Sequence, residues 1–218
     1  MRSLREGAGQ LRVAETTERL SRIGIKAFAQ QRRHHIEGGY GNPFSPPQRR
    51  GLWPFLKWRL FSANRYRADY AREVARPVNF DGWGCESLST PTITYINHAS
   101  VLIRDGGRSL LLDPVFSGLS ALLKDFSPLT QVPAAFKRPD VVLVTHGHYD
   151  HLDTASLSSL DPGAAVVAPL GYADHFAKLG LHNQTAMDWF DTCVIKAWRI
   201  TCLPSNHWTM RNPIVGPN

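Results

Sequence analysis

Four side chains of the kinds that bind metal ions lie within six residues of one another: His146, His148, Asp150 and His151. They follow the apolar run 139–145, which is typical of a strand covered on both faces, and ligand sites of open α/β sheets lie where such strands end. His146 and His148 are two residues apart, so in an extended loop they point the same way and can share one ion, while Asp150 and His151 can face a second ion. Imidazole nitrogen with carboxylate oxygen suits zinc, and also iron or manganese. A polar turn of solvated histidines is the alternative, but four donors at this spacing favour a metal site.

Three other polar residues stand next to predicted strands or helices and could support such a site. Asp113 precedes a proline at a strand end, so it either accepts a hydrogen bond from a ligand imidazole or only fixes the turn. His98 follows a strand and precedes small residues, which fits a residue behind the ligands as well as a packing residue. Asp153 is predicted to cap the next helix rather than to bind metal. The histidines without a ligand-like context are predicted to lie on the surface: His34, His35, His175 and His182.

The elements that must position these residues alternate between strands and helices, which predicts an α/β fold. The first part of the chain has a helical spacing over 15–31, followed by a Gly- and Pro-rich loop over 35–47. Downstream, the β-favouring runs are 93–96, 101–104, 109–112, 139–145 and 165–168, with one or two further strands in 194–203. Two helices are predicted over 154–160 and 172–179.

The pattern HxHxDH after an apolar strand resembles the motif of the metallo-β-lactamase superfamily. Further segments resemble, in chain order, the branch that hydrolyses N-acylphosphatidylethanolamine as a phospholipase D, and the resemblance runs from about His35 to Arg211. The segments that carry it are 94–100, 112–117, 141–153, 167–171, 188–191 and 204–208.

This resemblance implies an αββα sandwich with a binuclear zinc site. His146, His148 and His207 would hold the first ion, and Asp150 and His151 would contribute to the second. Without the resemblance, His207 would be interpreted as an ordinary surface or core residue. The family pattern around it implies that it is a ligand. The implied reaction is hydrolysis of a phospholipid phosphodiester to an N-acylethanolamine and a phosphatidate, with Asp150 also guiding the proton of the attacking water.

The resemblance also implies a bridging aspartate and a late histidine at the second ion, and up to Asn218 the sequence has no counterpart of either. We therefore expect about the first half of the sandwich, one zinc ion instead of two, and self-association through the uncovered core. Two other functions stay open: a related metallohydrolase acting on a soluble lactone or phosphoester, and an inactive metal-binding fragment.

Charge divides the 218 residues into two regions. Residues 1–76 contain 16 Lys+Arg and 6 Asp+Glu, a net charge of +10, whereas residues 77–218 contain 9 and 12, a net charge of −3. We expect a basic leader over 1–76 and the metallo-β-lactamase-like domain over 77–218. The aromatic and basic segment around Trp53 and Phe61 either contacts a membrane peripherally or packs on the domain. No nucleic-acid recognition motif is present, and three cysteines without a CxxC pair favour a reducing, cytoplasmic location.

Overall fold

The structure, a computed structural model, describes residues 18, 23–37, 39–44, 52–63, 65–80, 90–118, 125–207 and 209. The chain divides into two units, Met1–Ala63 with Leu203–Asn218, and Asn64–Cys202. The predicted boundary between residues 76 and 77 stays a prediction. Among the residues described, no helix has the length and apolarity needed to cross a membrane.

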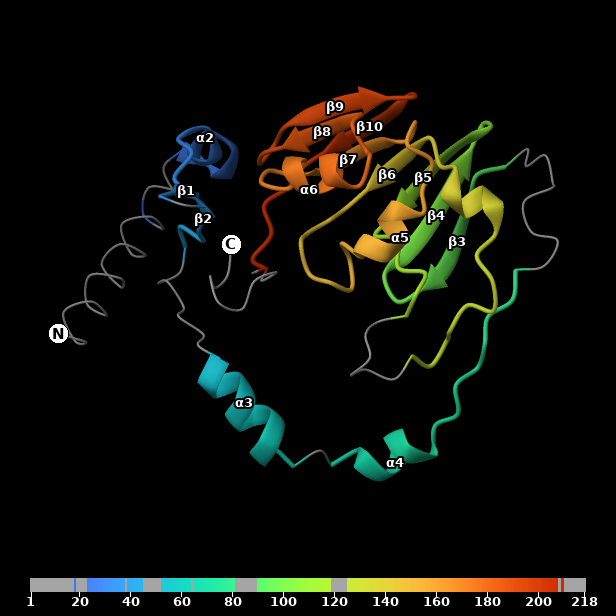
Figure 1. Ribbon diagram of the computed structural model, residues 1–218. Coiled ribbons are helices and arrows are strands. Elements are labelled where there is room, and N and C mark those ends of the chain that lie inside the picture. The colour runs from blue at the N-terminus through green and yellow to red at the C-terminus, as the bar shows by residue number, and fades with distance from the viewer. Residues whose placement is uncertain are drawn as a thin grey trace. The chain divides into compact units, whose positions relative to one another are not determined.

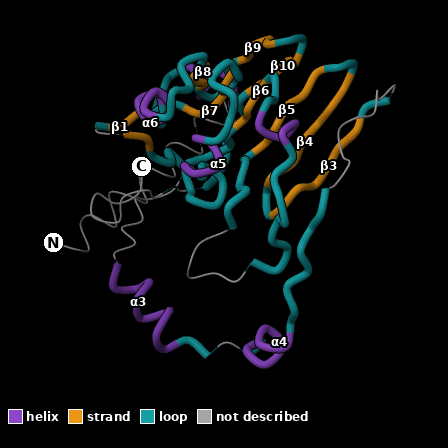
Figure 2. Tube along the Cα trace, turned by 45° about the vertical axis from the view of Figure 1, so that its right-hand side comes forward, coloured by secondary structure: helices purple, strands orange, loops and turns teal. Residues whose placement is uncertain are grey.

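A six-stranded sheet forms the centre of the unit Asn64–Cys202, in the order β3-β4-β5-β6-β7-β8 (Figures 1 and 2). Strands β3 to β5 form an antiparallel meander, and β5 to β8 run parallel. The bounds of the strands are β3 Thr92–Asn97, β4 Ser100–Asp105, β5 Arg108–Leu112, β6 Val141–Leu143, β7 Ala165–Pro169 and β8 Gln184–Met187.

The two faces of this sheet are covered differently. Val142 packs into a core cluster with Leu157 of α5 (Thr154–Ser158) and Phe176 of α6 (Ala173–Lys178), so both helices lie on one face (Figure 1). Its neighbour Val141 points to the opposite face, because side chains alternate along a strand, and joins a second cluster that includes Trp198. That residue belongs to the hairpin of β9 (Thr192–Ile195) and β10 (Trp198–Thr201). The layers are therefore helices, sheet and hairpin.

Most predicted elements of this unit are present, which confirms the α/β class. The region 194–203 forms two strands, and the turn at Gly106 and Gly107 joins β4 to β5 with positive φ at both residues. The predicted strand over 139–145 is shorter than expected, because pairing with β5 and β7 stops at Leu143 and the chain then turns into the loop that carries His146 and His148. Strand β8 was not predicted, since its sequence QTAM has neither a continuous apolar run nor β-branched repetition. The unit also contains α4 (Arg67–Arg72) and a short 3-10 helix, η1 (Ala134–Lys137).

The other unit contains α2 (Ile25–Gln30), a two-stranded hairpin and α3 (Leu52–Phe61). Most of the predicted helix over 15–31 lies outside the described residues. The loop predicted over 35–47 is wrong in its first part, where β1 (His35–Ile36) pairs with β2 (Gly39–Tyr40). His34 is only 4% exposed, so its predicted surface position is also wrong. The centroid of its ring lies 4.5 Å from that of the His35 ring, in an edge arrangement.

Candidate metal centre

Residues 144–153, which carry the four predicted metal ligands, form a loop that we call the ligand loop. It begins where the parallel strands end. The backbone N–H of Asp113 donates to Leu143 O (2.9 Å), and that of Val144 donates to Val167 O (2.9 Å), so the ends of β5, β6 and β7 are joined at the same edge. The loop then runs into α5, whose N-cap is Asp153, as predicted: its carboxylate accepts from the backbone N–H of Ser156 at 3.0 Å. Both ends of the loop are thus fixed by regular structure.

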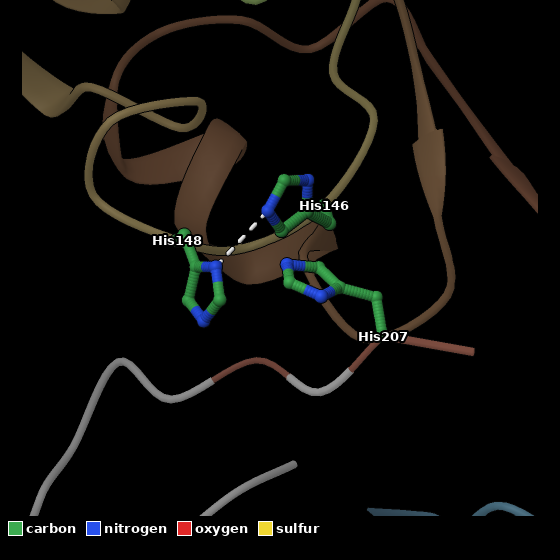
Figure 3. A group of neighbouring side chains, drawn as sticks. All are labelled: His146, His148 and His207. Atoms are coloured by element: carbon green, nitrogen blue, oxygen red, sulfur yellow. Dashed lines mark hydrogen bonds between the residues drawn. The ribbon is translucent and has the colours of Figure 1, made fainter. Parts of the chain in front are cut away.

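His146 and His148 lie next to each other on this loop (Figure 3). Nε2 of His146 and Nδ1 of His148 are 3.1 Å apart, and both side chains are half-buried. Nδ1 of His146 lies 2.9 Å from the hydroxyl of Thr145, which holds the ring from its other side. The two imidazoles therefore present nitrogen atoms to a common point, as a shared ion requires.

The carboxylate of Asp113 is buried, with the residue 3% exposed, and supports the loop from behind. Its Oδ1 accepts from the backbone N–H of Thr145 (2.7 Å), and its Oδ2 accepts from the Thr145 hydroxyl (2.7 Å). Oδ2 also lies 2.8 Å from Nδ1 of His151. This contact leaves Nε2 of His151 as the nitrogen able to bind an ion, which is the usual pairing of a carboxylate with a metal-binding imidazole.

Asp150 lies between His151 and His98. Its Oδ2 is 2.9 Å from Nε2 of His98 and 3.9 Å from Nε2 of His151. Partial burial acts to raise the pKa of the Asp150 carboxyl, but a hydrogen bond from its own backbone N–H and the neighbouring His151 and His98 lower that pKa more. The net pKa lies below the usual value, so the side chain is a carboxylate at neutral pH, the form that binds cations.

The two pairs of predicted ligands adjoin each other, because the rings of His146 and His151 are 4.0 Å apart between centroids. The structure thus brings together His146, His148, Asp150 and His151, with Asp113 and His98 beside them. His207, the predicted third ligand of the first ion, is exposed and belongs to the other unit, so its role stays a prediction.

Two features of the site were not predicted from the sequence. Thr145 contacts both Asp113 and His146, and only its position directly before the first histidine could have indicated this. Gly147 lies against Tyr172: a Cβ on this glycine would come within 2.6 Å of the tyrosine Cζ. Nothing in the local sequence links these two residues, which are 25 positions apart.

Comparison with known proteins shows the family of this chain. Residues 108–218, just over half of the chain, match the family described as the beta-lactamase superfamily domain. The chain is 31% identical to an N-acyl-phosphatidylethanolamine-hydrolyzing phospholipase D, mitochondrial, of Saccharomyces cerevisiae, over 81% of this chain and 48% of that protein. It is 28% identical to a UPF0173 metal-dependent hydrolase of Ligilactobacillus salivarius, over 50% of this chain and 49% of that protein.

A similar solved structure is that of a diiron beta-hydroxylase from Streptomyces venezuelae, with 21% identity and a TM-score of 0.41 over 54% of this chain and 24% of that one. The chain spans about half the length of the two curated relatives above. The match over residues 108–218 includes strands β5 to β10 and the whole ligand loop. The chain belongs to the beta-lactamase superfamily.

Proposed function

We propose that this chain is a metal-dependent hydrolase with two adjacent divalent ions at the loop 146–151. This is one ion more than the sequence alone predicts, because His146 with His148 and Asp150 with His151 form two adjacent donor pairs. The observation that carries the proposal is the hydrogen bond between buried Asp113 and His151, at 2.8 Å, beside the pair formed by His146 and His148. Buried carboxylates that orient an imidazole are a regular feature of metal centres.

The donor set fits zinc, with two imidazole nitrogens at one position and a carboxylate and an imidazole at the next. His146 and His148 would hold the first ion, with His207 as the third ligand; Asp150 and His151 would hold the second. When bound, two such ions lower the pKa of water and neutralise the oxygens of a phosphate undergoing displacement.

The residues of the chain itself have three tasks in this proposal. Asp113 holds the tautomer of His151 with Nε2 free to bind, and Thr145 holds His146. Asp150 stays ionised because its pKa is lowered, so it presents a negative charge that can bind a cation or accept a hydrogen bond from water. The loop is anchored to strand ends and a capped helix, and this anchoring keeps the donors in place before a substrate arrives.

For the substrate we propose an N-acylphosphatidylethanolamine, hydrolysed to an N-acylethanolamine and a phosphatidate. The yeast relative whose name states this activity supports it over 81% of the chain. Helix α3 adds support for contact with a lipid surface: Trp53, Leu60 and Phe61 are 70%, 69% and 77% exposed, and Lys57 lies on the same helix. Aromatic and basic side chains together are typical of helices that lie at a bilayer interface.

A second candidate is hydrolysis of a soluble lactone or phosphoester by the same centre. Similarity to the UPF0173 metal-dependent hydrolase, over half of this chain, supports it. The ligand loop supports metal-dependent hydrolysis for both candidates and does not distinguish between their substrates.

Zinc-loaded protein incubated with an N-acylated phosphatidylethanolamine in mixed micelles, followed by mass spectrometry of the products, tests the proposal. We expect release of N-acylethanolamine, with at least a roughly 100-fold loss in His146→Ala and no loss in the control His182→Ala, which changes an exposed histidine. Cleavage of a water-soluble phosphodiester but not the lipid would favour the second candidate. Failure to cleave either compound would overturn both candidate substrates, and full activity in His146→Ala would overturn the assignment of the metal site.

A further inference from the structure

We propose that His98 is a metal ligand, completing the second ion's site with Asp150 and His151. This inference rests on the proposed function, since it concerns the second of the two ions. His98 follows β3, some 50 residues before the ligand loop in the sequence, and the sequence alone predicts at most a supporting role for it.

His98 is held in an unusual backbone conformation. It lies in the two-residue turn between β3 and β4, with φ of +48°. The left-handed region is sterically unfavourable for a residue with a side chain. The strand pairing is also irregular between Tyr95 and Asn97, just before the turn. In this conformation the His98 side chain reaches the ligand loop, where its Nε2 contacts Asp150.

Hydrogen bonds connect this turn to Asp113, the residue that contacts His151. The hydroxyl of Ser100, two residues after His98, donates to the carbonyl oxygen of Asp113 at 2.7 Å and accepts from the backbone N–H of Val115 at 2.8 Å. Ser100 is fully buried. The same residue, Asp113, therefore fixes His151 through its side chain and the His98 turn through its backbone.

The possible ligand atoms of His98, Asp150 and His151 lie close together. Nε2 of His98 is 2.9 Å from Asp150 Oδ2, and that oxygen is 3.9 Å from Nε2 of His151. The ligand atoms of the three residues all lie within 4.8 Å of one another. Two ligands on a tetrahedral zinc ion, each about 2.0–2.1 Å from the metal, are about 3.3 Å apart, between the two distances seen here. Small side-chain adjustments would admit an ion.

The chemistry of the three groups also favours an ion over a closed hydrogen-bonded triad. Nδ1 of His151 is already engaged by Asp113, so its Nε2 is the nitrogen that faces the other two donors. The side chains of His98 and Asp150 are 33% and 37% exposed, so an ion and its water molecules can reach them. A cation would take the place of the hydrogen bond between His98 and Asp150.

The variant His98→Gln separates a ligand from a positioning residue. A glutamine amide can still donate a hydrogen bond to Asp150, but it is a poor ligand for zinc. His182→Gln makes the same replacement at an exposed histidine outside the centre and serves as the matched control. Each protein is titrated with Co²⁺, with ions per chain measured by elemental analysis and site geometry read from the visible absorption spectrum.

We expect two ions per chain in the unaltered protein and in His182→Gln. In His98→Gln we expect one ion per chain and a changed Co²⁺ spectrum. If a second ion still binds, its affinity should fall by more than the roughly 10–100-fold that the loss of a hydrogen bond to a ligand costs. Two ions and an unchanged spectrum in His98→Gln would overturn the ligand role and leave the proposed function intact. A single ion in the unaltered protein would also overturn the second site. No ion at all would overturn the proposed function itself.

Discussion

Oδ2 of the buried Asp113 lies 2.8 Å from Nδ1 of His151 and 2.7 Å from the hydroxyl of Thr145. One carboxylate at the end of β5 thus fixes two residues of a loop that begins some 30 positions later. The strands β5 and β6 are paired in parallel, so their carboxyl ends meet at one edge and bring these residues together.

Asp113→Asn tests this support directly. An asparagine in the same pose would present an amide N–H toward His151 or Thr145 and lose one accepting oxygen, so we expect affinity for the second ion to fall about 10–100-fold. Competition with a chromophoric chelator measures the affinity for Zn²⁺. Asp140→Asn is the control, because Asp140 accepts from the backbone N–H and hydroxyl of Ser109 at the other end of β5. Equal effects of the two substitutions would contradict a specific role for Asp113.

Gly147→Ala tests how tightly the ligand loop is packed. The new Cβ would lie within 2.6 Å of Cζ of Tyr172, a rigid ring atom, so the loop or the ring must move. We expect a loss of about 1–3 kcal/mol in the free energy of unfolding, measured in urea, together with weaker metal binding. Tyr172→Ala in the same chain should recover metal binding by removing the clash. Gly39→Ala is the control, since nothing lies within 4 Å of a Cβ there.

Exposed aromatic residues of α3 predict lipid binding. Trp53→Ala combined with Phe61→Ala removes two side chains that are 70% and 77% exposed. We expect co-sedimentation with anionic vesicles to fall about ten-fold or more, because the apolar area available to the bilayer shrinks. Val194→Ala, an exposed apolar position on β9, should leave binding unchanged. Vesicle binding that survives the double substitution would exclude α3 as the contact.

The position of β3 at the edge of the sheet predicts that the chain self-associates. Ile93 and Tyr95, on one face of this strand, are 75% and 61% exposed, and β3 ends the six-stranded sheet in the described part of the chain. A strand at the edge of a sheet has unpaired backbone N–H and C=O groups along one side, and these can pair with a strand of another copy. We expect Ile93→Lys to shift the chain toward monomer in sedimentation velocity, whereas Asp105→Lys, at the exposed end of β4, should not. A monomeric unaltered protein would contradict this expectation.

The lowered pKa of Asp150 predicts a dependence of stability on pH in metal-free protein. A carboxyl whose pKa is lower in the folded chain stabilises that chain above its unfolded pKa, near 3.8, and this contribution is lost as the pH falls through the folded value. The unfolding free energies of the unaltered protein and Asp150→Asn should therefore converge as the pH falls below about 4. Urea titrations between pH 3 and 7 in the presence of a chelator measure the difference. A difference in unfolding free energy between the two proteins that grows as the pH falls would contradict a lowered pKa of Asp150.

The sequence by itself predicted the ligand loop, because its donors are neighbours in the chain. His146, His148, Asp150 and His151 need only a strand before them and a helix after them to be placed, and both are indicated by local patterns: a continuous apolar run and an Asp153 cap. The α/β class followed from the same patterns. Strand β8 and the β1–β2 hairpin were missed, since short strands with ordinary composition form only when a neighbouring strand supplies the hydrogen bonds.

Only the tertiary structure decided what surrounds the loop. Whether Asp113 fixes a turn or orients an imidazole depends on the parallel pairing of β5 with β6, which no local pattern specifies. The approach of His98 to Asp150 depends on the hairpin between β3 and β4 and on its tie to Asp113 through Ser100. Contact between Gly147 and Tyr172 likewise joins two loops at the ends of adjacent strands. Local spacing predicts donors that share one loop, whereas contacts across strands depend on register and packing, which the whole chain sets together.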